Sequence, residues 1–408
     1  MRVLLVHPGA SWSTADVYDG LLLGLRHHGA NVIPYRLDTR IEASHKALHA
    51  LWRMKKKADP ELVKPTQNDT IYHAGVGALE MALRHQADVV LVVSAMLLHP
   101  DIIVMMKRAG LLVTVLFTES PYDFEEELRI AKMVDGCWLN ERAAVPAFKT
   151  VNPRTGYLPH AWHPDKHFMS PTSTSDFPAH DVVFVGSGFP ERVAWFNAID
   201  WTGIDLGLYG TWKGLGLKKQ VMKSVRAEQI ANDSAAEIYR KAKIGLNMYR
   251  TRGMKRQPPP VVGESLSPRA YELAACGVFS LSEYRKEVPE VFGDLVPTFR
   301  TPTEAAALIR LWLADSEGRK RVAAQLPACV AESSWTERAK TVLGDLQGLI
   351  GHEAAVDAAG SVEHGSLCGT QCGDVHLNVG CRHGDERGRH QPVDVEPRHG
   401  QDRDHVLR

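Results

Sequence analysis

The chain has 408 residues, which is long for a single hydrophobic core and predicts two domains. It is 44% hydrophobic and 24% charged, a composition typical of soluble globular proteins. Basic and acidic residues both number 48, so the total charge demands neither nucleic acid nor an anionic membrane as a partner. The local basic clusters at residues 53–57 and 250–256 are interpreted as solvated surface.

The start of the chain and its cysteines predict a cytoplasmic protein without a membrane span. The apolar run at residues 3–6 is far shorter than a signal-peptide core or a span of ~20 residues. Cys137, Cys276 and Cys329 stand alone in hydrophobic surroundings, which is typical of reduced structural thiols.

In the first half of the chain, short continuous apolar runs alternate with helical patterns. Strands are predicted at residues 3–6, 31–35, 88–94, 111–117, 136–139 and 156–158, with helices at 16–28 and 101–109. Continuous rather than alternating apolar runs indicate strands that are buried on both faces. They therefore predict a parallel sheet between two layers of helices.

Residues 161–180 are rich in proline, serine and threonine, and they are predicted to be a linker. The alternation then resumes with strands at 181–185, 205–209, 244–249 and 278–282, helices at 190–198, 234–242 and 268–276, and a helical block over 303–349. The sequence therefore predicts an α/β protein with two Rossmann-like doubly wound domains facing a cleft, at residues 1–160 and 181–350.

The last segment, residues 351–408, has a different composition. It holds seven of the 19 histidines and three of the six cysteines, but no lysine and no aromatic residue, and it is predicted to be disordered. An alternative is a zinc cluster, although the spacings match no strong template. Its ligands would be Cys368, Cys372, Cys381, His376 and His383.

A glycine turn, Gly186-Ser187-Gly188, lies between a buried strand and a helix that begins at Pro190. Such a turn can present backbone N–H groups and the positive end of a helix to a phosphate. Arg192, in the first helical turn, could add a charge-assisted contact. The alternative is a tight turn that binds nothing.

As a dinucleotide-binding fingerprint, this turn is incomplete. Glu191 occupies the place of the third glycine in G-x-G-x-x-G, and Asp205 matches only loosely the acidic residue that binds a ribose. An NAD-type oxidoreductase is therefore kept only as an alternative function.

The helix predicted at 268–276 has well-marked ends. Ser267 is a good N-cap, Pro268 suits the first helical position, and Gly277 is a C-terminal stop. Arg269 and Glu272 lie one turn apart near the positive end of this helix, which suits a ligand that carries phosphates and a ribose.

Seven residues separate Glu264 from Glu272, so that one carboxylate lies in the loop before the helix and the other lies inside it. Glu272 can accept two hydrogen bonds from a ribose diol, and Glu264 lies nearer the sugar. The alternatives are an ordinary ion pair between Arg269 and Glu272, and a solvated loop carboxylate at Glu264.

Five motifs in order, FVGSGFPERVAWF, LGLYGTW, AKIGLNMYR, SLSPRAYELAACGVFSLSEYRKEVPEVFG and VPTFRTPTEAAALIRLWL, resemble the donor half of the CgeB-like glycosyltransferases. This is a bacterial and phage group with the GT-B architecture. The stretches TESPY, from Thr118, and YLPHA, from Tyr157, resemble its first domain and the crossing to the second.

The resemblance implies that the second domain holds a nucleotide-diphosphate sugar and the first holds an acceptor, with no cofactor and no bound metal. It places Glu272 at the ribose and Glu264 at the first position of E-x7-E. In related enzymes an arginine and a lysine five positions apart contact the diphosphate, and here Ser187 and Arg192 take those places.

The donor-binding residues implied in this way include Tyr209 and Gly210 of LGLYGTW. Arg250 and Arg269 are candidates for the cation that replaces the charge missing at Ser187. No D-x-D pair occurs in the body of the chain, and Asp402 and Asp404 lie in the tail.

An inverting reaction needs a base in the first domain that deprotonates the acceptor hydroxyl. Two loops at the ends of predicted strands offer one, with Asp16 near His7 and with Glu119 near Asp123. The alternatives are a capping role for Asp16 and a turn-capping role for Glu119.

The function expected from the sequence is a glycosyltransferase. A non-enzymatic, two-lobed nucleotide- or sugar-binding protein is a further alternative. The acceptor stays open between a polysaccharide, a protein, a small molecule and modified DNA, for which residues 55–57 would supply positive charge.

Overall fold

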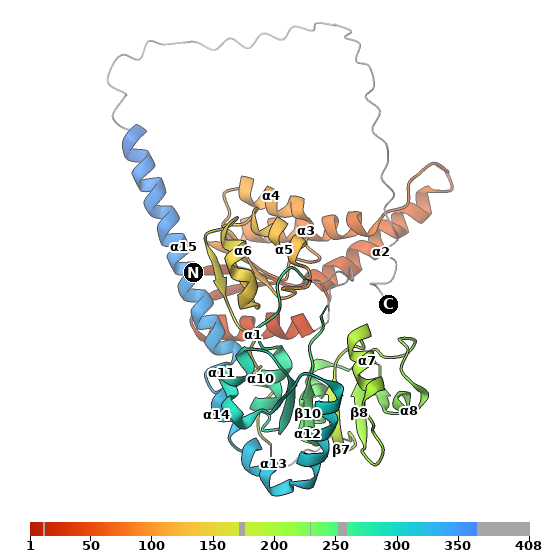
Figure 1. The fold of residues 1–408 in the computed structure, drawn as a ribbon. Helices are drawn as coiled ribbons and strands as arrows, with labels where there is room; N and C mark the ends of the chain where they lie inside the picture. Colours follow the sequence, from red (N-terminus) through yellow and green to blue (C-terminus); the bar gives the residue numbers. More distant parts are fainter. Residues whose placement is uncertain (11–12, 171–175, 229, 252–258, 365–408) are drawn as a thin grey trace, which may run out of the picture. The chain divides into compact units, whose positions relative to one another are not determined.

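The computed structural model describes residues 1–10, 13–170, 176–228, 230–251 and 259–364. The chain divides into a compact unit, Met1–Val356, and a second unit, Asp357–Arg408. Both sheets and all the site residues discussed below lie in the first unit (Figure 1). None of the described helices is long and apolar enough to cross a membrane.

The first half of the compact unit is a six-stranded parallel sheet with the order β2-β1-β3-β4-β5-β6. Its strands are β1 (Arg2–Val6), β2 (Asn31–Tyr35), β3 (Val89–Val93), β4 (Val113–Phe117), β5 (Gly136–Leu139) and β6 (Thr155–Tyr157). Its helices are α1 (Ser13–His27), α2 (Leu37–Lys55), α3 (Gln67–Arg84), α4 (Pro100–Arg108), α5 (Phe124–Ala131), η1 (Arg142–Ala144) and α6 (Val145–Lys149).

Alternate residues of a strand enter two different hydrophobic clusters, one on each face of this sheet. Leu4 and Val6 of β1 pack in a cluster with buried residues of α2, α3 and α4. Val3 and Leu5 pack in the other cluster with residues of α1 and of a C-terminal helix. Burial on both faces explains why these strands are apolar throughout.

The second half is another six-stranded parallel sheet, with the order β12-β11-β10-β7-β8-β9. Its strands are β7 (His180–Val185), β8 (Leu206–Tyr209), β9 (Val225–Ala227), β10 (Ala242–Asn247), β11 (Ser280–Glu283) and β12 (Thr298–Phe299). The helices are α7 (Pro190–Ala198), α8 (Lys219–Met222), α9 (Asn232–Arg240), α10 (Pro268–Ala275), α11 (Glu287–Phe292), η2 (Gly293–Leu295), α12 (Pro302–Ala314), α13 (Ser316–Ala323), α14 (Leu326–Cys329) and α15 (Trp335–His364).

The predicted pair of doubly wound parallel sheets is confirmed, and α7 has the predicted bounds. The ends of α10 also follow the prediction, with Pro268 in the first turn and Gly277 at φ 64°. The Ser267 hydroxyl, however, does not cap α10, because it donates to Asn247 Oδ1 at 2.7 Å. Helices α2 and α3 lie between residues 36 and 87, where no element was predicted.

The C-terminal helix α15 returns to the first sheet, although its sequence follows the second. Trp335, Ala339 and Val342 are buried in the cluster that contains Val3 and Leu5. The expected domain range of 181–350 therefore does not describe the packing of this helix. Two further differences concern the tail: α15 continues to His364, past the expected boundary at residue 351, and the cysteines and histidines from 368 onward lie outside the described residues.

We expect the contact between α1 and α15 to be intolerant of added volume. A Cβ at Gly20 would overlap the indole of Trp335, so Gly20→Ala should lower the free energy of unfolding by about 1–3 kcal/mol. Gly344→Ala is the matched control, because its Cβ would meet nothing within 4 Å on the exposed side of α15. It should raise stability by about 0.5–1 kcal/mol. Urea denaturation of both variants measures this, and equal effects would argue against the packing.

Candidate active site

The glycine turn after β7 packs closely against the turn after β8. The N–H groups of Gly186 and Gly188 donate to the carbonyls of Tyr209 at 2.8 Å and Thr211 at 2.9 Å. A Cβ at Gly210, where φ is 124°, would lie 2.5 Å from the Gly186 carbonyl oxygen. The glycines therefore let two loops approach, and these two N–H groups already have partners.

Three arginines meet at the carboxyl ends of β7 and β10. Arg192 of α7 donates to the carbonyls of Ser187 and Met248, each at 3.0 Å. Arg269 of α10 donates to the Val185 carbonyl at 2.8 Å and to the Met248 carbonyl at 3.4 Å. Arg250, which follows β10, forms an ion pair with Glu119 of the first half.

Two of these arginines lack a carboxylate partner among the described residues. Arg192 is 8% exposed, and its Nε has no hydrogen-bond partner in that part of the chain. Burial, together with the nearby Arg269 and Arg250, lowers the pKa of Arg192 to about 9. Arg269 is half-buried and lies over the Phe184 ring at 4.4 Å. Glu119, Glu191 and Glu283 lie near this cluster, but Arg192 and Arg269 form no ion pair with any of them, so two guanidinium groups are left for an anionic ligand.

Glu119 is held in place by a second carboxylate. Glu127 of α5 is buried, and it accepts the Glu119 N–H at 3.0 Å and the Ser120 hydroxyl. Tyr122 of the same loop lies under the Arg250 guanidinium, 4.2 Å from the ring centroid. The loop after β4 is thereby fixed against the arginine cluster.

Glu264 also lies between the two halves. Its carboxylate pairs with Arg142 at 3.2 Å and with Lys286. Hydrogen bonding to Lys286, with the charges of Lys286 and Arg142, keeps the pKa of Glu264 below its usual value. The backbone N–H of Glu264 donates to Glu141 at 3.0 Å, so the loop before α10 is tied to the first half.

Glu272 and Asp16 form another part of the candidate site. Glu272 is half-buried and accepts the Tyr239 hydroxyl at 3.3 Å rather than pairing with Arg269. Asp16 pairs with Lys166 at 2.6 Å, and the same lysine pairs with Asp233 at 2.8 Å. Burial raises the pKa of Glu272 and of Asp16, although Arg269 opposes this at Glu272 and Lys166 opposes it at Asp16.

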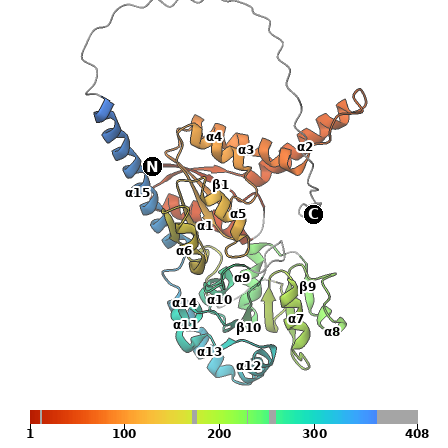
Figure 2. The same cartoon turned by 45° about the horizontal axis from the view of Figure 1, so that its top comes forward.

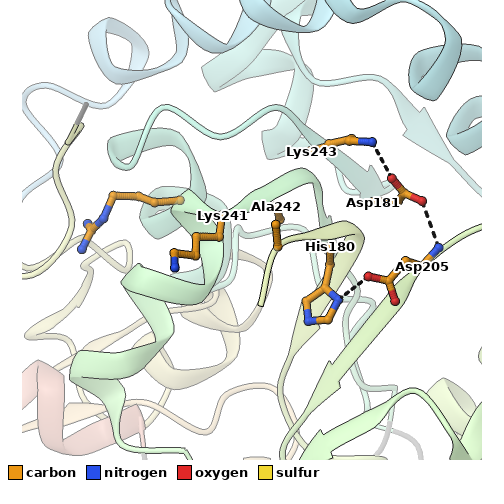
Figure 3. Close-up of a pocket in the computed structure, with 8 residues that line it drawn as sticks. His180, Asp181, Asp205, Lys241, Ala242 and Lys243 are labelled. Carbon is orange, nitrogen blue, oxygen red and sulfur yellow. Dashed lines mark hydrogen bonds and ion pairs between the residues drawn. The ribbon is translucent and has the colours of Figure 1, made fainter. Parts of the chain in front are cut away.

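Tyr209 does not join these groups. Its hydroxyl bonds to His180 Nε2 at 2.9 Å, and His180 begins β7 at the opposite edge of the sheet. A pocket of about 270 Å³ opens at that edge. In Figure 3 His180 is turned toward Asp205, at 2.9 Å, and Lys243 toward Asp181, at 2.7 Å. Both carboxylates that line the pocket, Asp181 and Asp205, are already engaged by neighbouring side chains. Asp205 lies immediately before β8, whereas the glycine turn follows the end of β7, so the two are at opposite ends of neighbouring strands.

The structure thus brings Ser187, Arg192, Arg250, Arg269 and Glu119 together, and it places Glu272 one helical turn from Arg269. Several polar side chains at this edge were not among the predicted site residues. They are Arg142, Glu141, Glu127, Lys166 and Arg285. Glu141 alone had a usable signal, because it comes two residues after a predicted strand. Lys166 lies in the predicted linker, and nothing in the sequence marks Glu127.

Comparison with known structures places the fold. The trehalose-6-phosphate synthase OtsA matches with a TM-score of 0.54 and 12% identity, over 85% of this chain and 99% of that one. AviGT4, a glycosyltransferase of avilamycin A biosynthesis, matches with a TM-score of 0.52 and 15% identity, over 86% and 98%. The fold is GT-B-like. An E. coli trehalose-6-phosphate enzyme bound with UDP-2-fluoro glucose matches with a TM-score of 0.52 and 12% identity, over 85% and 99%.

In sequence, residues 192–344 match a family described as glycosyl transferase-like. No curated protein matches the chain. The family match supports a glycosyltransferase, and the structural similarity supports the same fold. They support the earlier resemblance at this level, and the CgeB-like subgroup stays a prediction.

We expect the loop that carries Glu119 to make stability depend on pH through Glu127. Burial is the main cause that raises the pKa of Glu127 from 4.5 to about 8. The folded protein therefore binds a proton that the unfolded chain has lost, and stability falls as pH rises between these two values. Glu127→Gln, which mimics the neutral form, should gain stability relative to wild type over this interval.

Urea denaturation at several pH values measures the effect. Glu126→Gln, on the exposed side of the same helix, is the control and should keep the wild-type pH dependence. A constant difference between Glu127→Gln and wild type across the interval would contradict the assignment.

Proposed function

We propose that the protein transfers a sugar from a nucleotide-diphosphate donor to a hydroxyl acceptor. The observation that carries the proposal is the pair Arg192 and Arg269, which have no carboxylate partner among the described residues. Charged groups taken out of water are normally paired, and a diphosphate would supply the missing negative charge. The UDP-2-fluoro glucose bound to a structural neighbour supports a nucleotide sugar as the donor.

Several features favour this position for the diphosphate. Helices α7 and α10 both begin at the carboxyl edge of the second sheet, where their positive ends favour an anion. Arg269 is half-buried and has no carboxylate partner among the described residues, whereas Arg250 is already paired with Glu119, so we assign the direct contact with the diphosphate to Arg269. In this proposal the charge of the leaving diphosphate is balanced by arginines and helix ends, and a metal ion is given no role.

For the remaining residues we propose three roles. Glu272 binds the ribose, and its distance of one helical turn from Arg269 matches the step from diphosphate to ribose. Glu264 contacts the sugar from the loop before α10. Asp16 and Glu119 are both ion-paired, with Lys166 and with Arg250, and we favour Asp16 as the general base because burial raises its pKa.

Thermal shift with nucleotides tests the donor site. UDP or GDP at 100 times its Kd should add about 2.7 kcal/mol to the free energy of unfolding, and NAD should add nothing. Glu272→Gln, which can still accept the Tyr239 hydroxyl, should retain the melting temperature of the free protein and show a smaller shift with the nucleotide. A response to NAD alone would overturn the proposed transferase. Nucleotide binding without hydrolysis or transfer would indicate a binding protein instead.

A matched pair of variants tests the sugar-side role. Glu264 and Glu290 both accept hydrogen bonds from Arg142, at 3.2 Å and 2.8 Å. Glu264→Gln should lower turnover at saturating donor by about tenfold or more, equivalent to ~1.4 kcal/mol in the barrier. Glu290→Gln removes the other ion pair of Arg142, which involves α11 and not the loop before α10. It should leave turnover unchanged. Release of nucleoside diphosphate measures both, and equal losses would assign Glu264 to the ion-pair network only.

A further inference from the structure

The distal part of α2 and the connection to α3 form an arm without a buried residue. The arm is defined here as residues 45–66, the segment between Ser44, which is buried in α2, and the start of α3. No residue from 45 to 69 is buried, and the next buried one is Thr70. Figures 1 and 2 show this hairpin, in red and orange, reaching beyond the first sheet and its other helices.

Local contacts hold the arm together. The Trp52 indole donates to the Leu62 carbonyl at 3.1 Å, and the Lys56 ammonium lies 4.6 Å from the centroid of the Trp52 ring. A capping box between Thr66 and Asp69 begins α3. Most helices in proteins are stabilised by burial of an apolar face, and this end of α2 has no such burial within the described chain. Its side chains are therefore available to a partner.

The arm combines exposed apolar side chains with positive charge. Leu51, Met54 and Val63 are 48%, 76% and 82% exposed. Residues 45–66 contain six lysines and arginines against two acidic residues, whereas the whole chain has 48 of each. The cations are Lys46, Arg53, Lys55, Lys56, Lys57 and Lys64, and the acids are Asp59 and Glu61. Lysines alone would be an ordinary solvated surface. Large apolar side chains exposed among them are not expected on such a surface, and they indicate a partner.

We propose that this arm docks on an anionic phospholipid bilayer. Lysines contribute attraction to anionic headgroups, and side chains such as Met54 and Val63 enter the boundary of the acyl chains. A second copy of the chain is a poorer partner, because two arms of the same charge repel each other. A polyanion such as nucleic acid or an acidic polysaccharide would leave the apolar side chains in water. The proposal is independent of the reaction proposed above, and it requires no spanning helix.

Co-sedimentation of the full chain with vesicles tests the proposal. The vesicles consist of phosphatidylcholine alone, or of equal parts of phosphatidylcholine and phosphatidylglycerol. We expect binding to the anionic vesicles only. The triple variant Lys55→Ala, Lys56→Ala, Lys57→Ala should lower the partition coefficient roughly a hundredfold, since each lysine near an anionic surface contributes on the order of fivefold.

The apolar contribution is tested separately. Met54→Ser with Val63→Ser should weaken binding several-fold at a salt concentration that screens the lysines. Leu311→Ser is the control, because Leu311 is 62% exposed on α12 of the second half and should leave vesicle binding unchanged. As none of these residues is buried, the variants should keep the wild-type melting temperature and any donor-dependent turnover.

Three outcomes would overturn the inference. The first is a wild-type protein that does not sediment with anionic vesicles. The second is binding that the lysine and apolar variants leave unchanged, which would place the contact elsewhere. The third is salt-dependent binding to duplex DNA or heparin without vesicle binding, which would identify a polyanion as the partner of the arm.

Discussion

The two parallel sheets are joined by buried and half-buried charge at their carboxyl edges. Arg250 of the second half pairs with Glu119 of the first, and Arg285 of the second pairs with Glu141 of the first at 3.1 Å. The strand ends of an open parallel sheet are where ligands bind, because the connecting loops diverge there. Ion pairs between the two edges therefore decide which backbone groups and side chains face a common ligand.

Some carboxylates at the contact between the two halves accept hydrogen bonds from backbone N–H groups as well as from side chains. Glu141 is 2% exposed and accepts the N–H groups of Glu264 at 3.0 Å and Ser265 at 3.2 Å. Glu287 accepts the Leu266 N–H at 2.5 Å and the Tyr157 hydroxyl at 2.6 Å. Residues 264–266 are thus fixed from both sides, and the position of Glu264 depends on the first half as much as on its own helix. A loop held in this way loses little further entropy when a ligand binds.

The sequence predicted the sheets well because their signal is local. Strands buried on both faces are apolar throughout, and the ends of α10 are marked by Pro268 and Gly277. The contacts between the two halves were not predictable in the same way, since Glu141 and Lys166 act through partners far along the chain. The partners of Glu127 are nearby in sequence, but they lie in an irregular loop whose conformation no pattern predicts.

Tyr209 was predicted to bind the donor from its place in a motif, but its side chain does not lie with the other candidate residues. Tyr209 ends a strand that points toward the site, but its hydroxyl bonds to His180, whose ring lies over Gly207. A motif gives the position of a residue along a strand and does not give its rotamer.

Arg192 illustrates how a cation can shape a binding site that it does not itself line. Its guanidinium is buried and joins the carbonyls of Ser187 and Met248, so it connects the turn after β7 to the end of β10. Its charge nevertheless acts across the low-dielectric surroundings on the half-buried Arg269 and Arg250. Because Arg250 is paired with Glu119, the repulsion that a bound anion would relieve is mainly the one between Arg192 and Arg269. The arrangement therefore favours a ligand with concentrated negative charge over a neutral sugar, because only the former offsets the free energy of holding Arg192 away from water.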